Sequence, residues 1–295
     1  MAPEEKETPM NPMDKLDLHQ VDFHLHTAES PSPGAIPLDG LIREAEERGL
    51  LCISITDHWK EDTDPTIFLE ERKLIEQSSS NLKIYLSAEV EILDEQATSP
   101  VDPKAHRDVL KEMDYLSAAP HLGEFLPEVR RRELPEDKAE FLDYVHRKMM
   151  NILKSELFAL VLHPNYGLNE CAGWGLCSSP SIENVPERRL DEFAEAAAFY
   201  GKAVEINENV ASSVEGYDTF VEKLLKAGVK LVVGSDYHPE HKDRCWPGRT
   251  QNAVEVIRRC GGDKNSLWLP GGHSFNALCN IPQQGPLSEG DRKQD

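Results

Sequence analysis

The sequence predicts a single-domain α/β protein, built as a TIM-like barrel of seven strand–helix units. Three observations support this class. Short apolar runs alternate with longer amphipathic stretches, glycines stand where several of those stretches should end, and no long linker interrupts the alternation. Seven units in one continuous chain of 295 residues favour closure of the strands into a barrel over an open sheet.

Seven apolar runs are the expected strands. Each is four to seven residues long, which is too short for a helix of ordinary length. A helix that returns the chain between two runs makes the strands parallel, because successive runs then start at the same edge of the sheet. In chain order the runs are residues 20–24, 51–55, 83–89, 115–119, 158–162, 203–206 and 230–233.

Six amphipathic stretches between and after these runs are the expected helices, because their apolar residues recur at helical spacing. Asp39 is a candidate N-cap of the first helix. Gly49, Gly201 and Gly228 stand where a helix should stop before a strand. The stretches are residues 38–49, 68–77, 138–155, 187–201, 217–228 and 250–262.

Three segments lack this periodicity. Residues 165–185 are rich in glycine and serine and are expected to form a loop, either a lid or binding loop or a surface excursion without a role. Residues 1–17 and 282–295 are expected to be mobile tails. Residues 18–281 remain as the barrel domain.

The charge balance excludes some classes of partner. The chain has 53 acidic and 32 basic residues and a net charge of −21, which disfavours long nucleic acid and anionic membranes but suits multivalent cations. No apolar run is long enough to span a bilayer, and the first residues lack the apolar stretch of a signal peptide. The six cysteines form no Cys-x-x-Cys pair. We therefore expect a cytoplasmic protein, and the sequence leaves its oligomeric state open.

Histidines and carboxylates gather at the expected strand ends. In a β/α barrel the active site is built at the carboxyl ends of the strands, so residues from distant runs meet there. Imidazole and carboxylate ligands together suit Zn²⁺, Mn²⁺ or Fe²⁺. Of eleven histidines, six fall within a few residues of a strand end, namely His24, His26, His58, His121, His163 and His238. The acidic residues at the same places are Asp22, Asp57, Glu89 and Asp236.

Two of these runs carry further detail. His24 and His26 are one residue apart, so on an extended strand both imidazoles face the same side and can converge on one cation. Glu89 ends a run that is otherwise too apolar for a charge, and a carboxylate in such a setting needs a cation or a hydrogen-bond donor beside it. A carboxylate can also bridge two metal ions.

Six short motifs occur in a fixed order between Asp22 and His238. They are D-x-H-x-H-T at 22–27, T-D-H at 56–58, Glu89, His121, H-P at 163–164 and S-D-x-H at 235–238. This ordered set resembles the PHP (polymerase and histidinol phosphatase) domain family. The resemblance implies a distorted seven-stranded β/α barrel, two or three divalent metal ions at the strand ends, and hydrolysis of a phosphoester.

The resemblance also implies three sets of metal ligands. His24, His26, Glu89 and Asp236 would hold one ion. Glu89, His121 and His163 would hold a second ion, bridged to the first by Glu89, and His58 and His238 would belong to a third. The family usually supplies a further ligand to the third site where this chain has Pro31, Ser32 and Pro33. Glu29 could substitute, or the third site could be weak or empty.

The resulting hypothesis is a metal-dependent phosphoesterase that acts on a small phosphorylated substrate, such as histidinol phosphate, a sugar phosphate or a nucleotide. Asp57 is the candidate catalytic residue, to protonate the leaving group or orient the nucleophile, with His58 as the alternative. Asp22 and Asn207 are candidates to orient the ligand imidazoles. Candidates to grip the phosphate are Arg130–Arg132, Lys242, Arg244 and Arg249.

Two other functions remain open at this stage. Related metal barrels hydrolyse C–N bonds, although these amidohydrolases generally bridge their metals with a lysine, whereas the bridging candidate here is Glu89. A metal-binding module without turnover is the other alternative.

Overall fold

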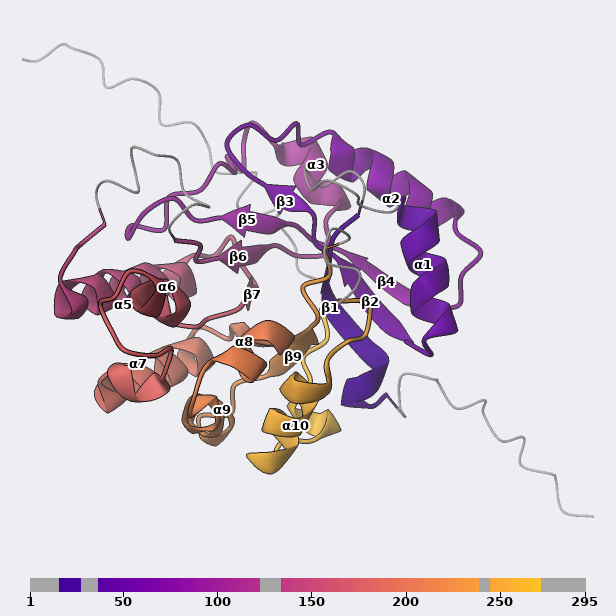
Figure 1. The fold of residues 1–295 in the computed structure, drawn as a ribbon. Coiled ribbons are helices and arrows are strands. Elements are labelled where there is room, and N and C mark those ends of the chain that lie inside the picture. Colours follow the sequence, from indigo (N-terminus) through magenta and orange to yellow (C-terminus); the bar gives the residue numbers. More distant parts are fainter. Residues whose placement is uncertain (1–15, 28–36, 123–133, 239–244, 272–295) are drawn as a thin grey trace, which may run out of the picture.

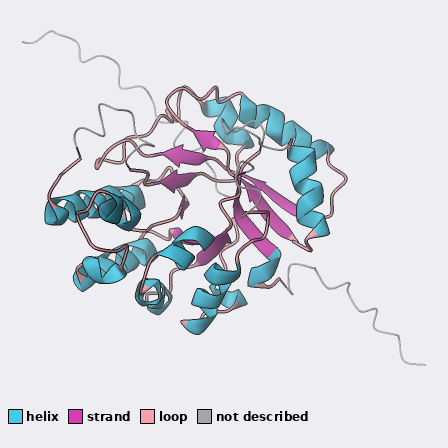
Figure 2. Ribbon diagram, in the orientation of Figure 1, coloured by secondary structure: helices cyan, strands magenta, loops and turns pink. Residues whose placement is uncertain are grey.

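The computed structural model describes residues 16–27, 37–122, 134–238 and 245–271. Helices form an outer layer around a group of strands, as expected for an α/β barrel (Figures 1 and 2). Most of both expected tails lies outside the described residues. So do five of the residues or ranges named above: Glu29, 31–33, Arg130–Arg132, Lys242 and Arg244.

Nine strands occur within the described ranges, and every pairing between them is parallel. They form a three-stranded sheet in the order β1-β2-β4 and a six-stranded sheet in the order β3-β5-β6-β7-β8-β9. Their bounds are β1 Val21–Leu25, β2 Cys52–Ile55, β3 His58–Trp59, β4 Lys83–Leu86, β5 Glu89–Glu91, β6 Ser117–Ala119, β7 Leu160–Val161, β8 Ala203–Asn207 and β9 Leu231–Gly234.

At two places an expected strand is divided in two, with one part in each sheet. The second run extends through β2 into β3, and the third is interrupted between β4 and β5. The amide N–H of Ser87 donates to the carbonyl O of Ile55 at 2.8 Å, and the amide N–H of Glu89 donates to the carbonyl O of Asp57 at 3.0 Å, so pairing persists across both interruptions. These breaks account for nine strands from seven apolar runs.

The first and last strands lie side by side. Leu25, at the end of β1, forms a parallel bridge with Tyr237, three residues after β9. The amide N–H of His26 donates to the carbonyl O of Tyr237, and the amide N–H of Tyr237 donates to the carbonyl O of His24, both at 3.3 Å. With the interruptions described above, this contact places the first and last strands next to each other, as in the distorted β/α barrel that the resemblance implies.

The six predicted helices are all present, and the described ranges contain three short helices that were not anticipated. The unanticipated ones have six residues each, which is too short to show a helical period. One of them, α6, lies within the segment 165–185 that was expected to be a loop. The bounds are α1 Leu38–Glu47, α2 Ile67–Gln77, α3 Arg107–Glu112, α5 Lys138–Lys154, α6 Leu168–Gly173, α7 Glu187–Phe199, α8 Glu208–Ser213, α9 Tyr217–Lys226 and α10 Gln251–Arg259.

The helix ends follow local chemistry, with one correction. Gly49, Gly201 and Gly228 have φ angles of 78°, 64° and 81° and follow the C-cap residues of α1, α7 and α9, as predicted, because glycine adopts this left-handed conformation without strain. The prediction that Asp39 caps α1 is wrong. The N-cap is Pro37, and Asp39 lies in the first turn, where its charge still favours the helix dipole.

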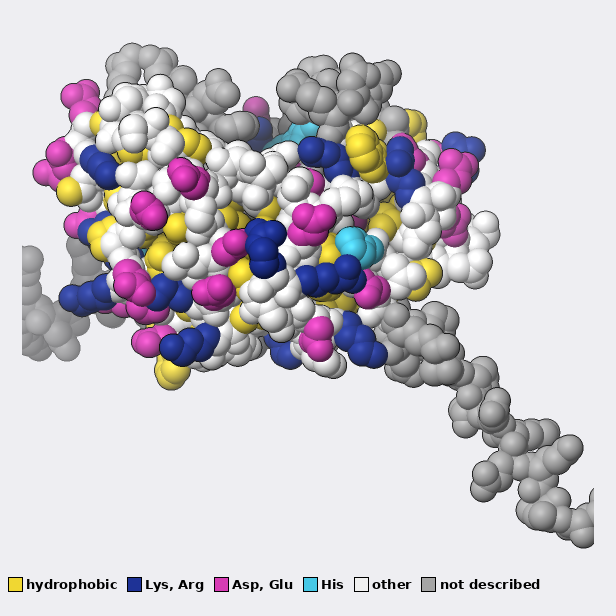
Figure 3. Space-filling model, turned by 60° about the horizontal axis from the view of Figure 1, so that its bottom comes forward, with side chains coloured by type: hydrophobic (Ala, Val, Ile, Leu, Met, Phe, Trp, Pro, Cys, Tyr) yellow, Lys and Arg dark blue, Asp and Glu magenta, His cyan; other side chains and the backbone are white. Residues whose placement is uncertain are grey.

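The outer surface carries charges of both signs. On the face that includes α9 and α10, acidic and basic side chains are interspersed (Figure 3). Several form ion pairs, including Arg259 with Asp218 at 2.7 Å and Lys223 with Asp191 at 2.6 Å. This face therefore presents no block of a single charge among its described residues. No helix in the described ranges is long and apolar enough to cross a membrane.

Candidate metal centre

The eight predicted metal ligands meet at the carboxyl ends of the strands, all within the described residues. They come from strands β1, β3 and β5 and from the segments that follow β1, β6, β7 and β9. Parallel strands bring these positions together because every strand ends at the same rim of the barrel. The predicted ligands are His24, His26, His58, Glu89, His121, His163, Asp236 and His238.

The carboxylate of Glu89 stands at the centre of this group. Its Oε1 lies 2.8 Å from Nε2 of His163 and 3.1 Å from Nε2 of His121. Its Oε2 lies 2.9 Å from Nδ1 of His58, 3.3 Å from Nε2 of His26 and 3.5 Å from Nε2 of His24. The side chain is 1% exposed. Each oxygen therefore faces a different set of imidazoles, which is the arrangement that a bridging carboxylate requires.

Asp236 lies close to three of the histidines. Its Oδ1 lies 3.2 Å from Nδ1 of His238, 3.4 Å from Nε2 of His24 and 3.7 Å from Nε2 of His26. The Nε2 atoms of His24 and His26 are themselves 3.2 Å apart. Two imidazoles one residue apart on a strand thus point to one place, as their spacing predicts.

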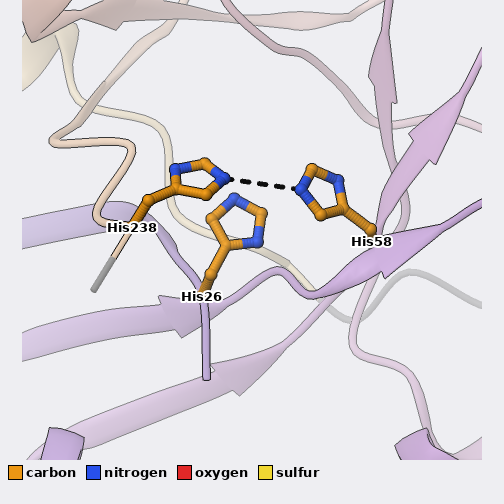
Figure 4. A group of neighbouring side chains, drawn as sticks. All are labelled: His26, His58 and His238. Carbon is orange, nitrogen blue, oxygen red and sulfur yellow. Dashed lines mark hydrogen bonds between the residues drawn. The ribbon is translucent and has the colours of Figure 1, made fainter. Parts of the chain in front are cut away.

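Three sets of side chains bring their ligand atoms within 4.8 Å of one another. One set consists of His24, His26 and Asp236, and another of His24, Glu89 and His163. In the third set, His26, His58 and His238 point toward one another, with 3.4 Å between the Nε2 atoms of His58 and His238 (Figure 4). His24 and His26 therefore each belong to two sets, which the sequence did not indicate.

Their surroundings shift the pKa values of the buried imidazoles in different directions. Burial lowers the pKa of His24, but the surrounding carboxylates, first that of Asp236, outweigh burial and raise this pKa well above its ordinary value. The pKa of His26 lies well below its ordinary value because it is buried and faces other histidines. Burial lowers the pKa of His121 to about 4. Neutral imidazoles such as the last two present lone pairs, which is the form that binds a metal ion.

The donor set fits a divalent cation. Burial raises the pKa of Glu89, but the imidazoles around it, first that of His58, outweigh burial and hold this pKa well below its ordinary value. Oε2 of Glu89 is buried without a hydrogen bond, although three ring nitrogens lie within 3.5 Å. A buried anionic oxygen among nitrogen donors is stabilised by a cation.

Two of the candidate ligands have an unusual backbone. His163 and Asp236 have φ angles of 28° and 54°, a region that residues other than glycine rarely adopt. Such backbone strain persists only where the surrounding structure holds it, and it concentrates at functional sites. The strain at both strand ends supports a functional role for this rim.

Glu205 contacts two residues of the centre, and it was not among the residues predicted from the sequence. It lies in β8, is fully buried, and its Oε1 accepts from Nδ1 of His24 at 3.0 Å. Its Oε2 accepts from the backbone N–H of His163 at 2.6 Å. The available signal was a charged residue inside the apolar run 203–206, the same signal that identified Glu89. A carboxylate behind an imidazole fixes the tautomer and direction of the ring.

Two predicted supporting residues have different roles from those expected. Asp22 was expected to orient imidazoles, but its carboxylate accepts from the backbone N–H groups of His24, Ser235 and Gly248 at 3.2, 3.0 and 2.7 Å. It therefore joins the ends of β1 and β9 to the segment after them. Asn207 donates from Nδ2 to Oε1 of Glu205 at 3.1 Å and to Oδ2 of Asp236 at 3.4 Å, so it contacts carboxylates of the centre rather than an imidazole.

Asp57, the candidate catalytic residue, is fully buried behind His26. It accepts from the backbone N–H of Thr27 at 2.7 Å and also from the hydroxyl of Thr27. Its Oδ1 lies 3.7 Å from Nδ1 of His26. Of the phosphate-binding candidates, Arg249 is the one described. Its guanidinium lies over the ring of Trp246, and its Nη1 is 3.5 Å from Oδ1 of Asn209.

Comparison with known proteins identifies the fold. No protein-family model and no curated protein sequence matches the chain. The histidinol phosphate phosphatase of Lactococcus lactis, solved with zinc, L-histidinol and phosphate, superimposes with a TM-score of 0.55 at 18% identity, over 83% of this chain and 94% of that one. A protein of Listeria monocytogenes assigned as a histidinol phosphatase gives a TM-score of 0.59 at 14% identity, over 74% of this chain and 95% of that one. The chain therefore has the fold of these proteins.

Proposed function

We propose that the chain is a metal-dependent phosphoesterase that hydrolyses a small phosphomonoester. The observation that carries this proposal is the position of Glu89, whose two oxygens face five imidazoles of the strand ends at 2.8–3.5 Å. Such an arrangement can hold two cations a few ångströms apart, and paired cations of this kind stabilise both the attacking and the leaving oxygen of a phosphoryl transfer.

We assign the ligands in three sets. His24, His26, Glu89 and Asp236 hold one ion. Glu89, His121 and His163 hold a second. His58 and His238 belong to a third site, and the approach of His26 to both of them supports that site without a ligand from residues 31–33. The fit to Zn²⁺, Mn²⁺ or Fe²⁺ rests on the mixture of imidazole and carboxylate donors.

The side chains of the centre have separate tasks. A divalent ion supplies Lewis acidity, which polarises the phosphoryl group and makes a nucleophile available near neutral pH. Glu205 holds the ring of His24 through Nδ1 and the backbone of His163, so the ligand atoms keep their direction. We assign Asp57 the same task toward His26, because it lies behind that ring. Its participation in the chemical step remains a prediction.

The open side of the centre is where a substrate reaches it. The side chains of His24, His26 and Glu89 are at most 1% exposed. Those of Asp236 and His238 are 21% and 20% exposed. A phosphoryl group would therefore approach the centre from the side of Asp236 and His238. The Lactococcus lactis protein, solved with L-histidinol and phosphate, supports a small phosphomonoester as the substrate class. Histidinol phosphate, a sugar phosphate and a nucleotide are the candidates.

The test is release of inorganic phosphate from a panel of these phosphomonoesters, with Mn²⁺ or Zn²⁺ added. Glu89→Gln is expected to lose bound metal and activity while circular dichroism shows an unchanged fold. Glu195→Gln, on the exposed side of α7, is the matched control and is expected to behave as wild type. If wild-type protein that carries metal releases no phosphate from any substrate, the proposed reaction is wrong. If Glu89→Gln retains its metal, the bridging assignment is wrong.

A further inference from the structure

A second group of charged side chains lies beside the metal centre. We call it the Glu91 cluster, and it consists of Glu91 on β5, Lys148 on α5 and Glu170 on α6. Glu91 is 3% exposed and Lys148 is fully buried. Lys148 donates from Nζ to the backbone carbonyl O of His121 at 2.6 Å. Because Glu91 follows Glu89 by two residues, the cluster adjoins two of the proposed ligands of the second ion.

The fold directs these side chains to the mouth of the barrel. Successive side chains of a strand alternate between faces, so Glu91 shares a face with Glu89 and lies one step nearer the carboxyl end of β5. The register pairs His58 with Glu89 and Trp59 with Val90, which places Lys60, the residue directly after β3, next to Glu91.

The two helices bring charge to the same place. Lys148 lies among the apolar residues that α5 buries, so its ammonium reaches the strand ends through a hydrophobic layer. Glu170 follows β7 and lies within electrostatic reach of His163 and Lys148. Three charges from three elements thus converge beside the second metal site.

The carboxylates of the cluster have unused acceptor atoms. Oε1 of Glu91 and Oε2 of Glu170 are buried and make no hydrogen bond. Among the described residues, Lys148 forms no ion pair with either of them, although its charge acts on both. A buried carboxylate oxygen without a partner is costly, and a structure retains such an atom where a ligand or water supplies the missing donor.

We propose that the Glu91 cluster is a subsite for the part of the substrate that carries hydrogen-bond donors, such as an ammonium or hydroxyl group. This inference rests on the proposed function, because the phosphoryl group must lie on the metal ions for the rest of the molecule to reach the cluster. The unused atoms are acceptors, so the ligand must donate. Lys148 holds the backbone of His121 and so couples the subsite to the centre.

The test compares three phosphomonoesters of similar size. Phosphoethanolamine carries an ammonium group, glycerol 1-phosphate carries hydroxyls, and propyl phosphate carries no donor beyond the phosphoryl group. Wild-type protein loaded with Mn²⁺ or Zn²⁺ is expected to give a kcat/KM at least about tenfold higher for one of the first two than for propyl phosphate, since an analogue without donors leaves the buried acceptors unpaired. Whichever donor substrate is preferred identifies the donor group.

Glu91→Gln tests the subsite directly, because the amide keeps the shape of the side chain and removes its charge. The preference over propyl phosphate is expected to fall at least about fivefold, mainly through KM. A merely structural role would change kcat/KM for all three substrates by the same factor. If Glu91→Gln does not fold, Glu170→Gln is measured in the same way. The control is Glu195→Gln, which is expected to retain the wild-type preference.

Each outcome decides the proposal. A donor preference in wild type that either variant reduces supports the subsite. Phosphate release from all three substrates without a donor preference, or a preference unchanged in both variants, overturns the subsite but leaves the phosphoesterase assignment intact. If wild-type protein carries metal but releases no phosphate from these substrates or the wider panel, both proposals fall.

Discussion

Gly234 is predicted to be essential to the candidate metal centre, although it binds nothing itself. It ends β9, where it pairs with Asn207 of β8. A Cβ atom at this position would lie 2.0 Å from Oε1 of Glu205 and 2.6 Å from Cβ of His24. Neither neighbour can yield easily, because Glu205 is buried and held by its hydrogen bonds to His24 and His163. Gly234→Ala should therefore displace the carboxylate that orients His24.

The magnitude follows from two effects. Overpacking a buried site costs about 1–3 kcal/mol. Loss of one charge-assisted hydrogen bond of Glu205 adds about 1.5–3 kcal/mol, so the free energy of unfolding should fall by about 2.5–6 kcal/mol. Metal content should fall as well, because the ring of His24 loses its support.

The assay is urea unfolding of the metal-free protein, followed by zinc content after reloading. Gly173→Ala is the control, because a Cβ there meets nothing within 4 Å and the residue is at the end of α6. Alanine should stabilise that helix by up to about 1 kcal/mol. Gly234→Ala within about 0.5 kcal/mol of wild type, with full zinc content, would refute the packing argument.

Two further predictions concern buried charges. Glu205→Gln should weaken metal binding by about 10–100-fold, since the amide no longer holds the His24 ring with a negative charge, and competition with a chelator measures this loss. Wild-type affinity in that variant would contradict the role of Glu205. Burial lowers the pKa of Lys148 to about 7. The unfolded chain then binds more protons than the folded chain between about pH 7 and 10.5, so stability due to this group rises with pH across that window. Lys148→Met should therefore be more stable than wild type near pH 7, by a margin that narrows toward pH 10, as denaturant unfolding would show. If the difference in stability between Lys148→Met and wild type does not vary with pH, the lowered pKa of Lys148 is contradicted.

The elements of the fold were largely predictable because they depend on local patterns. The six long helices and the seven apolar runs have periods that a single segment displays. The features that the sequence did not predict are short or lack a period. The helices α3, α6 and α8 span fewer than two turns, and the interruption between β4 and β5 at Ser87 has no sequence signal that distinguishes it from a continuous strand.

The candidate centre was also predicted from the sequence only in part. The positions of His24, His26 and Glu89 at strand ends follow from the sequence, because parallel strands in a barrel share a rim. Their mutual distances do not, and neither does the membership of His24 and of His26 in two of these sets each. Asp57 and Asp22 have the right residue type at the right place, yet their partners are the backbone and hydroxyl groups behind the rings.

The sequence by itself thus determined which residue types stand at the rim of the barrel, since strand periodicity and helix length decide where each strand ends. The tertiary structure alone decided which of them meet. Glu205 and Gly234 are the clearest examples, because the carboxylate of Glu205 on β8 reaches His24 and His163 only since Gly234 of β9 has no side chain beside it. Contacts of this kind join residues far apart in the chain, and their geometry is set by how the whole barrel packs rather than by any local pattern.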